Sequence, residues 1–551
     1  MIELNSDLKN LISLGGFVGL AQINPIAGNL KYNSEKIINS INEAVSMNLD
    51  IIAFPKNALL GFEMSDFISR YPFIITESCK WLQKIAEKCT KISALIGFIG
   101  EDKQQAYAIL RCGRVDKVLK DVDLITSKEF YDGVEFYFKP VAISSRVGSQ
   151  FIREEKLKNL ALSLKRPILE INQVGSIDSW SYSGQSLACD ENGNIFARAK
   201  DFEEQILVVN PFRKIGGKFS SEPEKTPNGF TLDYSWDLER TYKSIVQSIR
   251  DYFAKCGLKR AVLGLSGGLD STVCAVLLVD ALGKENVFGV SMPSKLTSNE
   301  SKSDAQKLAE NLGIGFAEAP IKEMYVTTDT CFQKLFSEVQ KTWDFRFKQS
   351  FTPDNIQARS RAMYLFGVAN EFESCIPIAT SDKSELYMGY ATINGDMSGG
   401  FAPIADVTKT KLFALARWMN ENREQKNAIP ESVILKRPGA ELAIDPNTGK
   451  TLCAEDALMP YEFLDEAIWR IENWHESYQE LMDTEFIYEK KNNISKEQKQ
   501  EWLNKFYRRM SFALFKGFIM PPSPIVDSNS INKVDYYQPV TSCGVDYKNI
   551  I

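Results

Sequence analysis

The stretch VLGLSGGLDSTVCAVLL, residues 262–278, joins two apolar runs through a short turn of glycines, serines and one aspartate. The first run predicts a buried strand ending at Ser266, and the second predicts a helix beginning near Asp270. Glycine lets a backbone approach a ligand closely, and a helix N-terminus attracts phosphate. Because Asp270 would repel a phosphate, we expect a divalent cation such as Mg²⁺ between them. The turn therefore predicts a nucleotide-binding site.

The turn matches neither of two common phosphate-binding patterns, since G-x-x-x-x-G-K-[ST] and G-x-G-x-x-G are both absent from it. Strand-like runs recur on its C-terminal side, with helix-like stretches between them. Strands at this spacing predict βαβ units and a doubly wound, Rossmann-like parallel sheet. The expected strands are residues 261–266, 287–293, 316–321 and 375–381, and the expected helices are residues 300–313, 355–372 and 409–420.

The N-terminal part also alternates strand-like and helix-like stretches, which predicts a separate, layered α/β domain over residues 1–213. Residues 214–232 are rich in Gly, Pro and Ser and lack periodicity, so we expect a linker there. The second domain then covers residues 233–551.

The amino-acid composition excludes several classes of function. Among 551 residues, 44% are hydrophobic and 25% charged, and the net charge is −6, which argues against a nucleic-acid partner. No run of about 18–20 apolar residues predicts a membrane span, and no basic N-terminal signal is seen, so we expect a cytoplasmic protein. His475 is the single histidine, which argues against Ser-His-Asp or Cys-His catalysis and against a zinc site.

SGGLDS, residues 266–271, resembles the signature of the ATP pyrophosphatase family, whose members release PPi and form an adenylated substrate. Four later blocks, residues 292–314, 354–370, 379–420 and 429–468, resemble NAD synthetases in order. The resemblance implies an adenine nucleotide alpha hydrolase-like fold for the second domain. The first domain resembles the nitrilase-like glutaminase of the two-domain, glutamine-dependent type.

The resemblance implies that the carboxylate of deamido-NAD attacks the α-phosphate of ATP, and that ammonia then displaces AMP to give NAD. ATP and Mg²⁺ are the implied cofactors, and Asp270, Glu385 and Lys409 the implied catalytic residues, with Asp270 and Glu385 as metal ligands. The implied ATP-binding residues are Gly264, Leu265, Ser266, Gly267, Gly268, Leu269, Asp270, Ser271 and Thr380. The implied deamido-NAD contacts are Asn355, Arg359, Glu385 and Lys436.

The nitrilase-like half departs from its family's Glu–Lys–Cys triad. Lys56 stands where the glutamate follows Phe-Pro, and Asp121 stands at the lysine position, with Lys120 beside it. No cysteine lies between Cys112 and Cys189, where the nucleophile belongs. Without base and thiolate no thioester can form, so we predict that this domain does not hydrolyse glutamine. The synthetase would then use free ammonia or a separate glutaminase.

Three other interpretations remain open at this stage. The chain could be a catalytically dead homologue that regulates or scaffolds an active synthetase, a glutamine-dependent synthetase with an unrecognised amidase site, or an amidating enzyme for another carboxylate. The resemblance implies a homodimer or larger homo-oligomer. In the tail, Tyr507 replaces a lysine that in the family reaches deamido-NAD, and Lys505, Arg508 or Arg509 could substitute for it.

Overall fold

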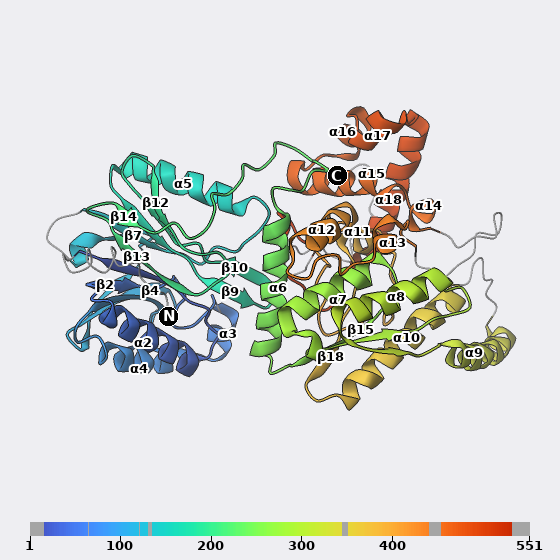
Figure 1. The fold of residues 1–551 in the computed structure, drawn as a ribbon, viewed down its shortest axis with the longest axis horizontal. Helices are drawn as coiled ribbons and strands as arrows, with labels where there is room; N and C mark the ends of the chain where they lie inside the picture. Colours follow the sequence, from blue (N-terminus) through green and yellow to red (C-terminus); the bar gives the residue numbers. More distant parts are fainter. Residues whose placement is uncertain are drawn as a thin grey trace. The chain divides into compact units, whose positions relative to one another are not determined.

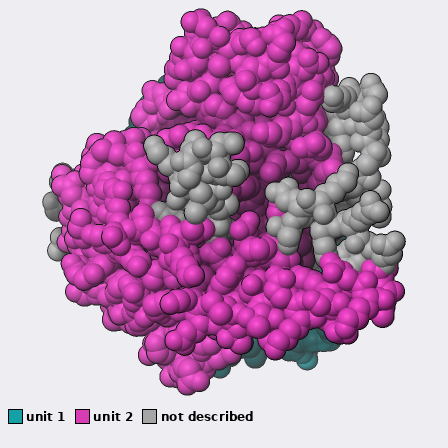
Figure 2. Space-filling view, turned by 90° about the vertical axis from the view of Figure 1, so that its right-hand side faces the viewer, with its two compact units in different colours: residues 1–225 teal, residues 226–551 magenta. Residues whose placement is uncertain are grey.

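The computed structural model describes residues 16–63, 65–120, 122–130, 135–343, 351–439 and 453–531. The chain forms two compact units, residues 1–225 and 226–551, which are coloured separately in Figure 2. Their boundary falls inside the segment 214–232. In the part of the chain that the structure describes, no helix is both long enough and apolar enough to cross a membrane.

The first unit holds two main sheets (Figure 1). One has the strand order β14-β13-β1-β2-β3-β4-β5, the other has the order β12-β11-β8-β7-β6, and β9 pairs with β10. Its helices are α2 (Leu30–Ser46), α3 (Ser65–Arg70), α4 (Phe73–Ala86) and α5 (Ser149–Leu164). Its strands are β1 (Val18–Gln22), β2 (Ile51–Ala53), β3 (Ser93–Ile99), β4 (Gln105–Arg111), β5 (Arg114–Lys120), β6 (Ile125–Thr126), β7 (Tyr137–Pro140), β8 (Ile168–Ile171), β9 (Val174–Ile177), β10 (Trp180–Ser183), β11 (Leu187–Cys189), β12 (Ile195–Arg198), β13 (Gln205–Asn210) and β14 (Ile215–Gly216).

Alternation along the strands produces four layers in this unit. On β1, Val18 and Leu20 face the apolar core between the two sheets, while Ala21 faces the core beneath α2 and α4. On the outer face of the five-stranded sheet, Leu157 of α5 packs against Leu187. Because successive strand residues point to opposite faces, each sheet buries both sides. The result is the nitrilase-like α-β-β-α arrangement.

The segment predicted as a linker differs from the prediction at its start. Ile215–Gly216 is β14 and pairs antiparallel with β13, at the edge of the seven-stranded sheet. Gly216 also lets β14 approach β12 of the other sheet closely, since a Cβ there would lie 2.4 Å from the side chain of Ala197. The strand was missed because a two-residue edge strand has no readable periodicity.

The second unit is built on a four-stranded sheet with the order β17-β16-β15-β18, and every neighbouring pair is parallel. Its strands are β15 (Arg260–Gly264), β16 (Val287–Ser291), β17 (Gly315–Glu318) and β18 (Cys375–Pro377). The helices around the sheet are α6 (Leu238–Lys255), α7 (Leu269–Leu282), α8 (Asn299–Leu312), α9 (Lys322–Thr342), α10 (Thr352–Glu371), α11 (Lys383–Tyr387) and α12 (Lys409–Asn422). This is the doubly wound sheet that the sequence predicts.

Both faces of this sheet are covered (Figure 1). Ala261 and Leu263 of β15 face a core shared with α6, α7, α8 and α12, while Val262 faces α10 on the other side. A further helical layer packs around Phe463, Phe486 and other apolar side chains. It consists of α14 (Ala454–Ala457), α15 (Tyr461–Trp474), α16 (Tyr478–Asp483), α17 (Ile487–Asn492) and α18 (Lys496–Gly517), whereas α13 (Glu431–Leu435) packs against the core shared with α7 and α12.

Candidate functional site

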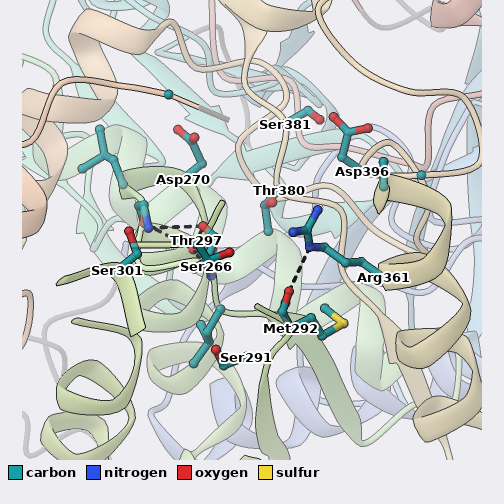
Figure 3. A pocket seen from close by; sticks show the side chains of 18 of the residues that line it. Ser266, Asp270, Ser291, Met292, Thr297, Ser301, Arg361, Thr380, Ser381 and Asp396 are labelled. Carbon is teal, nitrogen blue, oxygen red and sulfur yellow. Dashed lines mark hydrogen bonds between the residues drawn. The ribbon is translucent and has the colours of Figure 1, made fainter. Parts of the chain in front are cut away.

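A cavity of about 250 Å³ lies in the second unit at the carboxyl ends of β15, β16 and β18. The chain runs from β15 outward to β16 and β17, then returns to place β18 on the other side of β15. Such a reversal leaves a crevice beside the strand ends, where ligands bind in open α/β sheets. Figure 3 shows Asp270, Thr380 and Arg361 around this cavity.

The glycine–serine turn forms one wall of the cavity. Gly264, Leu265, Ser266, Gly268, Leu269, Asp270 and Ser271 all line it, as does Thr380 from the loop after β18. The hydroxyl of Ser266 accepts from the Gly268 N–H at 3.2 Å and lies 3.2 Å from the Ser271 hydroxyl. The N-cap residue of α7 is Gly268, which has no side chain to cap the helix. This wall therefore combines hydroxyls with a helix N-terminus, a combination suited to phosphate.

Gly267 differs from its neighbours because it does not line the cavity. Its φ is +74°, and a Cβ at this position would lie only 2.2 Å from the backbone oxygen of Ser301. The residue therefore shapes the turn by letting the start of α8 pack against it. Only glycine meets both conditions without strain.

Asp270, Asp382 and Glu385 form a carboxylate cluster around the ammonium group of Lys409. The Lys409 Nζ lies 2.6 Å from Asp270, 2.6 Å from Asp382 and 3.1 Å from Glu385. Only 1% of the Lys409 side chain and none of the Asp382 side chain is exposed. The cluster holds one positive charge against three carboxyl groups, so it is short of positive charge.

The pKa values of the cluster residues reflect their burial together with this charge imbalance. Burial raises the pKa of Asp382 to about 6, although Lys409 opposes the shift. Burial likewise raises the pKa of Glu385 well above its usual value. Burial alone would lower the pKa of Lys409, but the three carboxyl groups outweigh it and raise that pKa well above normal. Lys409 therefore stays charged, and a further cation bound beside Asp382 and Glu385 would lower the pKa values that burial has raised.

The donor set fits a divalent cation. Carboxylate oxygens of the three cluster residues lie within 4.8 Å of one another. Mg²⁺ prefers oxygen ligands and commonly uses one or two carboxylates together with substrate phosphates. Asp270 and Glu385 were predicted as ligands, whereas Asp382 was missed. Its position directly before a helix, where its side chain accepts the Glu385 N–H at 2.9 Å, was the available signal.

The predicted deamido-NAD residues divide into two groups. Glu385 and Lys436 line the cavity, and Lys436 donates to the Ser301 hydroxyl. Asn355 and Arg359 are not among the lining residues. Asn355 accepts a hydrogen bond from Thr392, and Arg359 donates to the Ile393 carbonyl at 3.2 Å.

Arg361, which the sequence analysis did not single out, lines the cavity instead. Its Nε donates to the Met292 carbonyl at 3.1 Å, as Figure 3 shows. Asp396 also lines the cavity. The sequence signal for Arg361 was its place in the same helix-like block as Arg359, two residues further on.

The tail residues also have defined places in the second unit. Tyr507 is buried in the helical layer. Lys505 donates to the carbonyls of Ala457 and Leu458, at 3.3 and 3.1 Å. Arg509 lies over the ring of Tyr390, which itself lines the cavity.

In the first unit, Lys56 follows β2 and is half-buried, and its backbone N–H donates to the Val141 carbonyl. Asp121 lies outside the described residues. The unit contains four cysteines, of which Cys89 and Cys189 are buried. Burial raises the pKa of each of these two thiols to about 12, which makes thiolate formation unfavourable.

Fold and site define a class: an α/β protein with a nitrilase-like unit followed by a Rossmann-like unit that has a carboxylate-lined cavity at its strand ends. Comparison with known proteins gives the family. Residues 241–510 match the NAD synthase family. The chain is 32% identical to the glutamine-dependent NAD(+) synthetase of Thermotoga maritima, over 82% of this chain and 88% of the relative. It is 31% identical to that of Aquifex aeolicus, over 95% and 98%. The chain belongs to the glutamine-dependent NAD(+) synthetase family.

Solved structures agree with this assignment. The glutamine-dependent NAD+ synthetase of Acinetobacter baumannii, in complex with adenosine diphosphate, is 25% identical, with a TM-score of 0.66 over 95% of this chain and 98% of that chain. The synthetase of Cytophaga hutchinsonii, at 19% identity, has the same fold, with a TM-score of 0.77 over 97% and 99%.

Proposed function

We propose that this protein is an NAD synthetase that amidates deamido-NAD at the expense of ATP and takes its nitrogen from free ammonia. Membership of the family supports the reaction class. The observation that carries the proposal is the carboxylate cluster around Lys409, of which Asp270 and Glu385 line the cavity beside the glycine–serine turn. A catalytically dead homologue would have no reason to keep three carboxyl groups so close together.

In the proposed reaction, a carboxylate oxygen of deamido-NAD forms a bond to the α-phosphorus of ATP, and the bond to the leaving PPi breaks. The lone pair of ammonia then attacks the acyl carbon. The C–O bond to AMP breaks, and the nitrogen loses a proton as the amide forms. The incoming nucleophile is already an amine, so no histidine base is required.

The residues of the site have separate roles in this reaction. The turn and the N-terminus of α7 would hold phosphate oxygens, with Thr380 as a further ATP contact. Asp270, Glu385 and Asp382 would hold Mg²⁺, which supplies charge neutralisation at the triphosphate when bound. Lys409 would stabilise negative charge near the same phosphates.

The dinucleotide would lie along the rest of the cavity. Arg361, Lys436 and Arg437 are cations among the lining residues, and arginine suits phosphate recognition. Asn355 and Arg359 would contact deamido-NAD at the mouth of the site.

The first unit supports the choice of ammonia over glutamine. The described part of this unit buries an ionic network: Glu170 pairs with Lys139 at 2.7 Å and with Arg153 at 2.8 Å. Arg198 pairs with Glu154 at 2.8 Å, and these last two side chains are almost fully buried. A buried, paired network of this kind packs a domain interior but provides no nucleophile.

One assay tests both parts of the proposal. The purified protein is supplied with ATP, Mg²⁺ and deamido-NAD, and either ammonium or glutamine, while NAD and PPi are measured. We expect NAD from ammonium alone. Equal rates from glutamine would contradict the assignment of the first unit, and a lack of PPi release in every mixture would contradict the synthetase assignment.

A second measurement isolates the first unit. A glutamine analogue bearing an electrophilic diazoketone labels the thiol of an active glutaminase, and intact-mass analysis detects the adduct. We expect no glutamine-protectable labelling at any of the four thiols in residues 1–225. Labelling of one thiol that glutamine prevents would restore a glutaminase role.

We also propose that the synthetase half forms a homodimer through α9 and α10. No residue of α9 is buried, and Val326 and Leu335 on it are about half exposed. Met363 and Phe366 on α10 are exposed as well. Light scattering after size exclusion should give twice the chain mass, and Leu335→Glu with Met363→Glu should give monomers. A monomeric wild-type protein would refute this proposal.

A further inference from the structure

Lys383 is completely buried, and all of its ammonium protons have acceptors. Its Nζ donates to Glu472 at 2.8 Å, to Asp527 at 2.8 Å and to the carbonyl oxygen of Asn529 at 2.5 Å. Asp406 lies 3.5 Å away and adds a third carboxyl group. We call Lys383, Asp406, Glu472 and Asp527 the Lys383 hub.

The hub lies behind the carboxylate cluster, on the opposite side of the short helix α11. Asp382 and Glu385 direct their carboxyl groups toward Lys409, whereas Lys383 and Ser384, between them, bond in the other direction. Residues 382–385 therefore have two faces. The carboxyl groups of Asp382 and Glu385 form the functional face, and the side chains of Lys383 and Ser384 form the anchored face. Movement of the anchored face would move both carboxyl groups together.

Residues 382–385 are also hydrogen-bonded to the start of α12, which carries Lys409. The Lys383 N–H donates to the Val407 carbonyl at 3.0 Å, and the Lys409 N–H donates to the Ser384 hydroxyl at 2.9 Å. Asp465 accepts from Ser384 behind this joint. The backbone that carries Lys409 and the backbone that carries Asp382 and Glu385 are thus held together by the same buried hydrogen bonds.

The C-terminal segment 523–531 completes the hub. Asp406 accepts the backbone N–H groups of Val526 and Asp527 at 2.8 and 2.9 Å, so the segment is fixed by its backbone as well as by its side chain. Asp527 and Asn529 then hold Lys383 from the far end of the chain. Since Lys383 offers three donors and uses all three, the hub leaves it little freedom to move.

We propose that Lys383 is a positioning residue, held by the C-terminal segment, that sets the spacing of Asp382 and Glu385 for a divalent cation. The inference rests on the proposed function, in which these carboxyl groups hold Mg²⁺. Groups that orient metal ligands without touching the metal commonly change metal affinity or activity 10–100-fold, roughly, when they are removed. We therefore expect an effect of about tenfold or more here.

The test compares Lys383→Met with Lys499→Met. Lys499 is an equally buried lysine, 2.9 Å from Glu489, that also donates to the Thr484 carbonyl in the helical layer. Mn²⁺ binding is followed by electron paramagnetic resonance with α,β-methylene-ATP present, and KM and kcat are measured separately. Asp527→Asn is a milder second variant, because it keeps the side-chain size while removing one charge.

The inference predicts that Lys383→Met weakens Mn²⁺ binding about tenfold or more, that Asp527→Asn weakens it less, and that Lys499→Met changes it less than about twofold. If Lys383→Met does not fold, Asp527→Asn against Lys499→Met decides the question. Normal Mn²⁺ binding in the hub variants, or equal loss in Lys499→Met, would overturn the inference while leaving the proposed function intact. Wild-type protein that binds no Mn²⁺ and releases no PPi would overturn both.

Discussion

Replacement of Lys409 by methionine should destabilise the second unit in a way that depends on both pH and Mg²⁺. Methionine keeps most of the volume but removes the ammonium group that faces Asp270, Asp382 and Glu385 at 2.6 to 3.1 Å. Breaking a buried ion pair by removing one partner costs about 3–5 kcal/mol. We expect a loss of that order at about pH 8, which is above the pKa of about 6 that burial gives Asp382.

The pH dependence has a definite sign. Lys409 lowers the pKa values of Asp382 and Glu385, so its removal raises them further. At about pH 5, below the raised pKa of Asp382, this carboxyl group of the variant carries a proton in the folded state and needs no cation, so the loss of unfolding free energy should be smaller. The difference between wild type and variant should therefore grow as pH rises from about 5 to about 8.

Mg²⁺ should partly reverse the loss. A ligand present at 100 times its Kd stabilises the folded state by about 2.7 kcal/mol. Because the variant lacks its resident cation, Mg²⁺ should stabilise it more than it stabilises wild type. Urea unfolding at both pH values, with and without MgCl₂, measures these quantities.

Lys411→Met is the matched control. Lys411 lies on the same helix and forms a buried pair with Asp237 at 2.7 Å, away from the carboxylate cluster. It should lose stability without any gain in the Mg²⁺ effect. An equal loss for Lys409→Met at both pH values, or an Mg²⁺ effect no larger than in wild type, would refute the assignment of the cluster as a cation site.

Three further predictions follow from single positions. Gly267→Ala should cost at least about 2 kcal/mol and weaken ATP binding, because a left-handed backbone alone costs roughly 1–2 kcal/mol and the Cβ would also meet the Ser301 oxygen. Gly367→Ala in α10, where nothing lies within 4 Å, should instead stabilise by about 0.5–1 kcal/mol, and a similar loss in both would contradict this account. Arg361→Met should raise the KM for deamido-NAD about tenfold or more, and more than Arg359→Met does, since Arg361 lines the cavity; the reverse order in steady-state kinetics would place the dinucleotide elsewhere. Burial raises the pKa of Asp465 to about 7, so its contribution to stability is present below the unfolded value near 4 and is lost as pH rises to about 7. The Tm of wild type should therefore fall over this range and that of Asp465→Asn should fall less, whereas parallel slopes in calorimetry would exclude Asp465 as a source.

Much of this protein follows from local sequence. The alternation of strand-like and helix-like runs predicts the parallel sheet of the second unit, because each element's buried face is written in its own periodicity. The turn around Gly267 is likewise local, since a left-handed residue between a strand and a helix needs glycine. One histidine among 551 residues already favours chemistry based on charge and bound cations.

Only the tertiary structure decides which side chains meet. Asp270 and Lys409 are 139 residues apart and lie 2.6 Å from one another, a distance that no local pattern contains. Arg359 and Arg361 are two residues apart on one helix, so their side chains point about 160° apart, and the packing of α10 determines which one lines the cavity. Lys383 reads as one more charged residue in a polar motif, and its role depends on burial against a segment that lies 144 residues further along the chain. Periodicity is set within a few residues, whereas charge pairing in a buried site is set by how distant elements pack.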